Sequence, residues 1–69
     1  MKNFLDYQFK RNSDNLFILH DKSTFWKFFK ILRKNNYKPG EALNFIFTNC
    51  CLSALVFQEC IYNNKYKEI

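Results

Sequence analysis

The sequence predicts a small α+β domain, with a short N-terminal β-ribbon or hairpin followed by two α-helices over about residues 23–35 and 39–62. Polar and apolar residues alternate near the N-terminus, and a helical apolar stripe comes next. The single proline and the single glycine, Pro39 and Gly40, then precede a long apolar run. The 69 residues make one domain, 1–69, in which 20% of the residues are aromatic. This predicts either an unusually aromatic core or a core that dimerisation completes.

The ribbon is expected over about residues 3–20. In residues 3–11, apolar side chains alternate with polar ones, which is typical of a half-buried strand; the apolar members are Leu5, Tyr7 and Phe9. The sequence RNSDN at residues 11–15 has the composition of a turn. The next five residues, LFILH at 16–20, form either a second strand that pairs back or the start of a helix capped at Ser13.

The clearest predicted helix covers residues 23–35. Asp21 or Ser23 caps its N-terminus, and Asn35 and Asn36 end it because asparagine tolerates the left-handed conformation found after helices. Four apolar residues fall within roughly 100° of one another and form its buried stripe: Phe25, Phe28, Phe29 and Leu32. The opposite side is basic and consists of Lys27, Lys30, Lys34 and, on its flank, Arg33.

The second predicted helix begins at Pro39, which suits a first helical turn because no N–H is needed there. Gly40 lets the chain turn sharply before it. The helix is apolar on nearly every side, and such a helix is buried on more than one side. One amphipathic helix and a ribbon cannot cover it, so we expect a homodimer. The predicted interface consists of Leu43, Phe45, Ile46, Cys50, Ala54 and Phe57.

The segment NNYKPGEALNFI, residues 35–46, resembles the ribbon-helix-helix family of the MetJ/Arc type. A helix ends at an asparagine, an apolar residue follows, and a small residue then precedes a glutamate and a run of aliphatics; the matching residues are Asn36, Tyr37, Gly40, Glu41, Ala42 and Leu43. The resemblance implies an intertwined dimer whose paired strands lie in the major groove of DNA. It also implies that the start of the second helix holds a phosphate, near Gly40 and Lys38. At the ribbon, Gln8 would contact base edges, and Lys10 and Arg11 would contact phosphates.

The formal net charge is +5 and the isoelectric point is about 9.3. This excess favours a polyanionic partner, although a simple solubility bias produces the same balance. The basic side of the first helix is either a phosphate-binding surface or an ordinary solvated face. We do not expect it to lie on a membrane, because the apolar stripe of this helix is needed to cover the second helix.

The sequence predicts no catalytic, metal or cofactor site. Cys50, Cys51 and Cys60 lack a C-x-x-C spacing, and adjacent cysteines on a helix point about 100° apart, so zinc binding together with His20 is not expected. The cysteines are interpreted as small buried hydrophobes. An odd number of cysteines and the absence of an evident signal peptide predict a reducing, cytoplasmic location. The local set His20, Asp21 and Ser23 is interpreted as a helix start rather than a nucleophilic site.

Two functions remain. The first is a small basic dimeric DNA-binding protein, such as a repressor or an antitoxin-like regulator. The second is a small inhibitor or adaptor, of the kind that viruses and mobile elements encode, that binds a host protein. Such a protein would use a strand edge or the flank of the first helix at Trp26.

Overall fold

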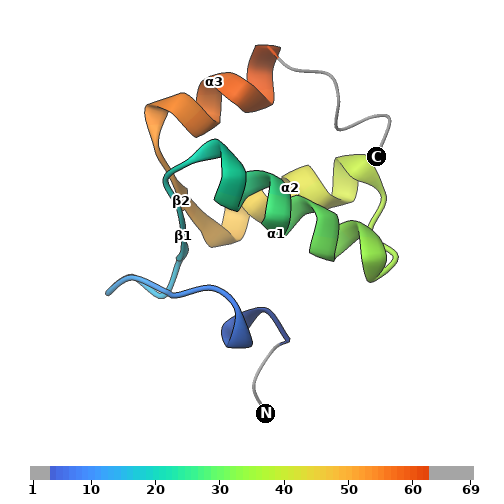
Figure 1. Ribbon diagram of the computed structural model, residues 1–69, viewed down its shortest axis with the longest axis horizontal. Coiled ribbons are helices and arrows are strands. Elements are labelled where there is room, and N and C mark those ends of the chain that lie inside the picture. The colour runs from blue at the N-terminus through green and yellow to red at the C-terminus, as the bar shows by residue number, and fades with distance from the viewer. Residues whose placement is uncertain (1–3, 63–69) are drawn as a thin grey trace.

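The computed structural model describes residues 4–62, which form a two-stranded sheet, three α-helices and a short 3₁₀ helix (Figure 1). The elements are, in chain order, η1 (Phe4–Tyr7), β1 (Phe17–Leu19), α1 (Lys22–Lys34), α2 (Pro39–Asn49), β2 (Cys50–Leu52) and α3 (Ala54–Tyr62). The α+β class agrees with the sequence prediction. The number of helices and the pairing of the strands differ from it.

The two strands run parallel, with Phe17 opposite Cys50 and Leu19 opposite Leu52. Parallel neighbours need a long connection, and here α1 and α2 provide it. Figure 1 shows the strand pair at one end of these two helices, with α3 on one side of them and the N-terminal segment on the other.

The predicted strand over residues 3–11 is wrong for the part that the structure describes, and Asn3 lies outside that part. Residues 4–7 form η1, and the backbone N–H groups of Gln8 and Phe9 both donate to the Leu5 carbonyl. The two buried side chains in this segment are Leu5 and Phe9, and both a strand and a helical turn place residues four apart on one side. Tyr7 decides between them, because it is 78% exposed although strand alternation predicts it inside.

The predicted turn after residue 11 is confirmed, but the hairpin is reduced to a single antiparallel bridge between Arg11 and Phe17. The side-chain oxygen of Asn12 accepts from the backbone N–H groups of Asp14 and Leu16. Asn15 has a φ of 64°, which asparagine tolerates. Of the two alternatives for residues 16–20, the structure has the strand, over Phe17–Leu19.

Helix α1 confirms the first predicted helix and its two caps. The Asp21 carboxylate accepts from the backbone N–H of Thr24 at 2.7 Å. At the other end Asn36 has a φ of 72°, and the N–H of Tyr37 donates to the Leu32 carbonyl, as in a Schellman motif. All four residues of the predicted apolar stripe are fully buried: Phe25, Phe28, Phe29 and Leu32.

The second predicted helix begins at Pro39 as expected but does not continue to residue 62. It ends at Asn49, and near this end two side chains donate back to carbonyl groups one turn earlier: Thr48 donates to the Asn44 carbonyl and Asn49 donates to the Phe45 carbonyl. The chain then becomes extended as β2 and resumes a helix at Ala54. An apolar run can be a buried helix or a buried strand. Here residues Cys50–Leu52 of the run are extended because they pair with β1.

The core is aromatic. Five of the nine phenylalanines are buried: Phe9, Phe17, Phe25, Phe28 and Phe29. The Phe28 ring is central, since its centroid lies 4.8 Å from that of Phe9, 5.2 Å from that of Phe17 and 6.1 Å from that of Phe45. Within residues 4–62 no polar or charged residue is buried. No helix in this part of the chain is long and apolar enough to cross a membrane.

Gly40 does not carry the sharp turn expected of it. It lies in the first turn of α2 without a positive φ, and a Cβ added there would meet no atom within 4 Å. We therefore predict that Gly40→Ala raises the free energy of unfolding by about 0.5–1 kcal/mol, since alanine loses less backbone entropy.

Asn36→Ala should lower the free energy of unfolding by about 1 kcal/mol, because Asn36 has a left-handed backbone conformation that alanine adopts at a cost. Urea unfolding followed by circular dichroism measures both, and a destabilised Gly40→Ala variant would contradict the first prediction.

Ser53 joins the sheet to α3. Its hydroxyl donates to the His20 carbonyl at 2.9 Å and accepts from the backbone N–H of Val56 at 3.2 Å. We predict that Ser53→Ala lowers the free energy of unfolding by about 1–2 kcal/mol, because it removes a helix cap and a contact with the end of β1. Ser53→Thr keeps the hydroxyl and is the matched control. Equal urea midpoints for parent and alanine variant would show that neither bond matters.

Candidate functional site

Within residues 4–62, the basic side chains are confined to one part of the fold. The chain has eleven Lys and Arg residues, yet residues 39–62, which form α2, β2 and α3, contain none. The charged residues of this segment are Glu41 and Glu59. The basic residues of the described chain therefore lie on the N-terminal segment, on α1 and on the turn that follows α1.

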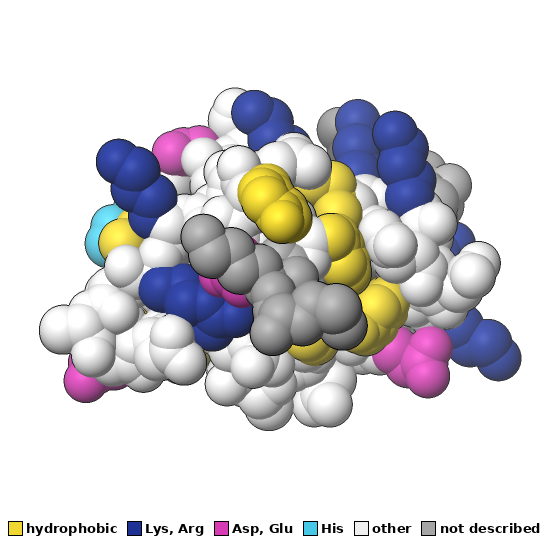
Figure 2. Space-filling model, turned by 90° about the horizontal axis from the view of Figure 1, so that it is seen from below, with side chains coloured by type: hydrophobic (Ala, Val, Ile, Leu, Met, Phe, Trp, Pro, Cys, Tyr) yellow, Lys and Arg dark blue, Asp and Glu magenta, His cyan; other side chains and the backbone are white. Residues whose placement is uncertain are grey.

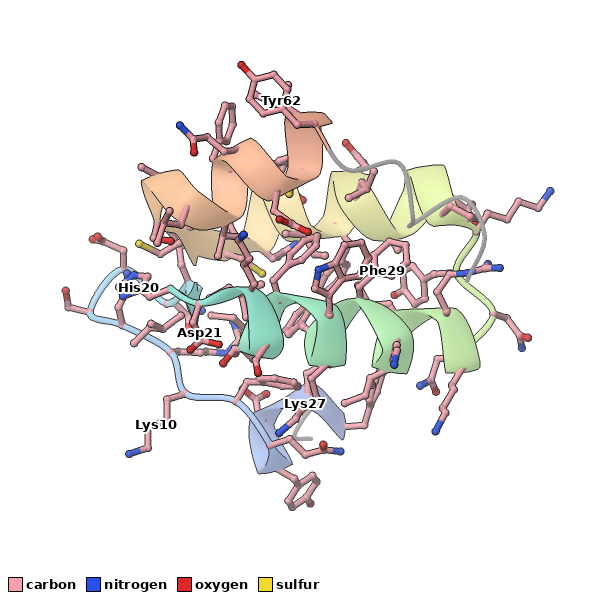
Figure 3. The ribbon with its side chains drawn as sticks, turned by 45° about the horizontal axis from the view of Figure 1, so that its top comes forward. Lys10, His20, Asp21, Lys27, Phe29 and Tyr62 are labelled. Carbon is pink, nitrogen blue, oxygen red and sulfur yellow. The ribbon has the colours of Figure 1, made fainter. Side chains whose placement is uncertain are left out.

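Three lysines form a continuous exposed stripe on α1, which we call the lysine face: Lys27, Lys30 and Lys34. They lie three and four residues apart on the side opposite the buried phenylalanines, as the sequence predicts. None of them forms an ion pair within residues 4–62. Figure 3 shows Lys27 pointing away from α3, and in Figure 2 dark blue side chains project along the upper edge of the molecule.

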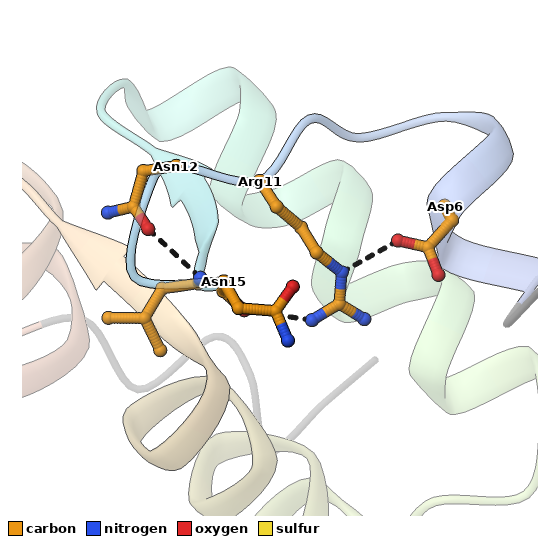
Figure 4. Close-up of polar contacts among 5 residues, drawn as sticks. Asp6, Arg11, Asn12 and Asn15 are labelled. Carbon is orange, nitrogen blue, oxygen red and sulfur yellow. Dashed lines mark hydrogen bonds and ion pairs between the residues drawn. The ribbon is translucent and has the colours of Figure 1, made fainter.

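The two arginines among the predicted binding residues are occupied by contacts within the chain. Arg11 donates to the Asp6 carboxylate at 2.7 Å and to the Asn15 carbonyl at 2.9 Å (Figure 4). Its guanidinium also lies 4.0 Å from the centre of the Phe17 ring. Arg33 donates to the Tyr37 carbonyl at 2.7 Å and so holds the turn after α1. The structure assigns both side chains to packing and turn formation.

The remaining predicted contacts with nucleic acid are dispersed. Gln8 is exposed but follows η1 instead of lying in a strand. Lys10 and Lys38 are exposed. At the start of α2, the Glu41 carboxylate accepts from the backbone N–H of Lys38 at 2.9 Å. The start of α2 therefore already has a carboxylate near Gly40, at the place where the family resemblance implies a phosphate.

A second surface is apolar and lies on α3 and the end of α2. Five large side chains there are between 48% and 79% exposed, and together we call them the apolar face: Phe47, Leu55, Phe57, Ile61 and Tyr62. The Phe47 and Phe57 rings lie 6.2 Å apart and connect the two helices. In Figure 3, Tyr62 and Lys27 point to opposite sides of the molecule. Exposed apolar clusters of this kind mark interaction surfaces.

The six residues predicted to form a dimer interface do not share one surface. Ile46 and Cys50 are buried in the core of their own chain. Leu43 and Phe45 are half-buried against that core, while Ala54 and Phe57 are exposed on α3. The helix break at β2 explains this division, because residues before and after it no longer follow one helical stripe. Trp26, the predicted partner-binding residue, is half-buried and packs edge-on against Phe25 and Phe29.

The cysteines differ in their surroundings. Burial raises the pKa of the Cys50 thiol to about 12 and that of the Cys60 thiol to about 11. Cys51 is half-buried, and its Sγ lies 3.6 Å from Nε2 of His20. The sequence does not predict this contact, because its long apolar run places both neighbouring cysteines on a helix. Residues 4–62 contain no group of three or more His, Cys, Asp and Glu side chains that would hold a metal ion.

The local set His20, Asp21 and Ser23 is not assembled as a nucleophilic site. The Asp21 carboxylate accepts from the backbone N–H and the hydroxyl of Thr24. The backbone bond to Thr24 is the main cause that lowers the pKa of Asp21 from its usual range. The carboxylate is thus engaged in capping α1.

The resemblance to the ribbon-helix-helix family stays a prediction. Its residues, 35–46, form the turn after α1 and the first part of α2, while β1 pairs in parallel with β2 of the same chain. No protein-family model matches this chain, and neither a curated protein nor a solved structure matches it.

Proposed function

We propose that this protein is a homodimer that binds nucleic acid through its lysine face. The observation that carries the proposal is the separation of the two surfaces: the lysine face lies on α1, and the apolar face lies in a segment without a single basic residue. Nucleic acid is the polyanion that such a surface suits best, since phosphate contacts supply most non-specific affinity.

The apolar face suits a second copy of the chain. In a two-fold dimer the same patch meets itself. Because α2 and α3 carry no lysine or arginine, this contact adds no positive charge from these two helices, and Lys22, which lies beside Leu55 and Tyr62, is paired with Glu59. Lys27 points away from α3 (Figure 3), and the lysine faces would then remain open to solvent on both copies. A dimer presents twice the positive surface to one polyanion, and two linked contacts bind more tightly than one.

The intrachain contacts of Arg11 and Arg33, together with the Glu41 carboxylate at the start of α2, leave the lysine face as the main phosphate-binding surface. Gln8 does not lie in a strand, so no strand would present it to the base edges in the major groove. The lysine side chains are flexible point charges that suit phosphates. We therefore expect sequence-independent binding, with an architectural or protective role more suitable than that of a site-specific repressor.

The first test concerns the dimer. We predict that the parent chain sediments as a dimer at tens of micromolar, and that Phe57→Lys sediments as a folded monomer, because two buried ammonium groups would face one another without partners. Phe57 is 50% exposed, so the variant should fold. Sedimentation velocity and circular dichroism measure the two properties.

Tyr7→Lys is the matched control, since Tyr7 is an exposed aromatic residue on η1, outside the apolar face. It should remain dimeric. A parent chain that is well folded and monomeric at this concentration would contradict the dimer and leave the apolar face for a different protein. In that case the second candidate function, an adaptor that binds a host protein, takes its place.

The second test concerns the lysine face. We predict that Lys27→Gln, Lys30→Gln and Lys34→Gln each weaken binding to all duplexes alike and flatten the plot of log K against log salt by about 1, since each phosphate contact contributes a slope of about −0.9. Fluorescence anisotropy of random and selected duplexes across a salt series measures this.

Lys22→Gln removes the same charge from a lysine that pairs with Glu59 at 3.4 Å, and it is the matched control. Its salt slope should equal that of the parent. If the parent binds no duplex below about 10⁻⁴ M near physiological salt, where non-specific binders register, the nucleic-acid proposal fails.

A further inference from the structure

The strand β2 places two adjacent thiols on opposite sides of the sheet. Successive side chains of an extended chain point to opposite faces. Cys50 therefore points into the core, where it is 8% exposed, and Cys51 points outward and is half-buried. The third cysteine, Cys60, is 6% exposed on the inner side of α3. Cys51 is the thiol of this chain that a reagent in solution can reach.

The register of the sheet brings His20 to this thiol. Ile18 lies opposite Cys51, and His20 follows two residues later on the same face. Nε2 of His20 lies 3.6 Å from Sγ of Cys51, within hydrogen-bonding reach of a sulfur atom. Ser53 fixes the backbone on either side, because its hydroxyl donates to the His20 carbonyl at 2.9 Å and its N–H donates to the Leu19 carbonyl at 3.4 Å. Figure 3 shows His20 at the surface.

The neighbouring charged groups have other partners. Asp21 caps α1, and Lys22 pairs with Glu59 of α3. On the N-terminal side, Arg11 pairs with Asp6. The imidazole of His20 is thus the titratable group in contact with the Cys51 sulfur.

We propose that Cys51 and His20 form a site for thiol–disulfide exchange with small organic disulfides. His20 takes the proton of the thiol, and the thiolate attacks one sulfur of the disulfide. A new bond forms between Cys51 and that sulfur while the original S–S bond breaks. The other sulfur leaves as a thiolate and receives the proton from His20. The small disulfide is the oxidant, the products are a mixed disulfide and one small thiol, and an excess of thiol reverses the step.

The first arm of the test counts and locates the reactive thiol. The folded chain is treated with the aromatic disulfide 5,5′-dithiobis(2-nitrobenzoate), and the released thiolate is followed by absorbance. We expect one fast equivalent, which peptide mass spectrometry assigns to Cys51, and three equivalents in denaturant. Cys51→Ser should remove the fast phase, and Cys60→Ala should keep it. A Cys51 that reacts no faster than Cys50 and Cys60 would overturn the proposal.

The second arm tests His20. A positioned base in an enclosed active site contributes a hundredfold or more, so for this exposed pair we expect His20→Gln to lower the second-order rate constant at neutral pH by about tenfold. The variant should also differ from the parent in the pH profile of the rate, because the group that accepts the thiol proton has been removed. Circular dichroism checks the fold, and His20→Asn is a second variant at the same exposed position. An unchanged rate and an unchanged profile in both folded variants would remove His20 from the site and the proposal with it.

Discussion

The parallel pairing of β1 with β2 joins segments 33 residues apart, and much of the structure depends on it. Closing so long a loop costs entropy before any contact forms. The compensation is hydrophobic, because the inward residues of β1, Phe17 and Leu19, are fully buried in the core, where the Phe17 ring lies 5.2 Å from the Phe28 ring of α1. With both strand ends fixed, α1 and α2 must fill the connection between them, and Ser53 can then direct α3 back across α1.

The parts that the sequence predicts correctly are those with local signals. Helix α1 has a capping aspartate, a stripe of phenylalanines at helical spacing and an asparagine that accepts the left-handed conformation, and all three act within a few residues. Pro39 marks the start of α2 for the same reason. The lysine face follows from α1 alone, since a helix with one buried stripe exposes the opposite side. For this part of the candidate site, the sequence was sufficient.

The parts that it predicts wrongly depend on partners far along the chain. An apolar run such as residues 42–57 is compatible with a buried helix and with a strand, and only the presence of β1 makes Cys50–Leu52 extended. The N-terminal segment is similar, because Leu5 and Phe9 are four apart and satisfy both periods. Arg11 and the pair of His20 with Cys51 also depend on tertiary register. The spacing of residues in the sequence does not indicate that Arg11 pairs with Asp6 or that Cys51 contacts His20.

Helix α3 connects the small size of the domain to its exposed surface. It packs onto the core through a narrow side, with Val56 and Cys60 as its buried residues, and leaves Leu55, Phe57 and Ile61 at least half exposed. A chain of 69 residues has few other elements to cover these side chains, and small domains commonly obtain the missing burial by association. Cover from a second copy would stabilise α3 and, through Ser53, the strand pair behind it. Because residues 39–62 carry no lysine or arginine, such an association would bring few positive charges into the contact, while repulsion between like charges would keep the lysine faces apart.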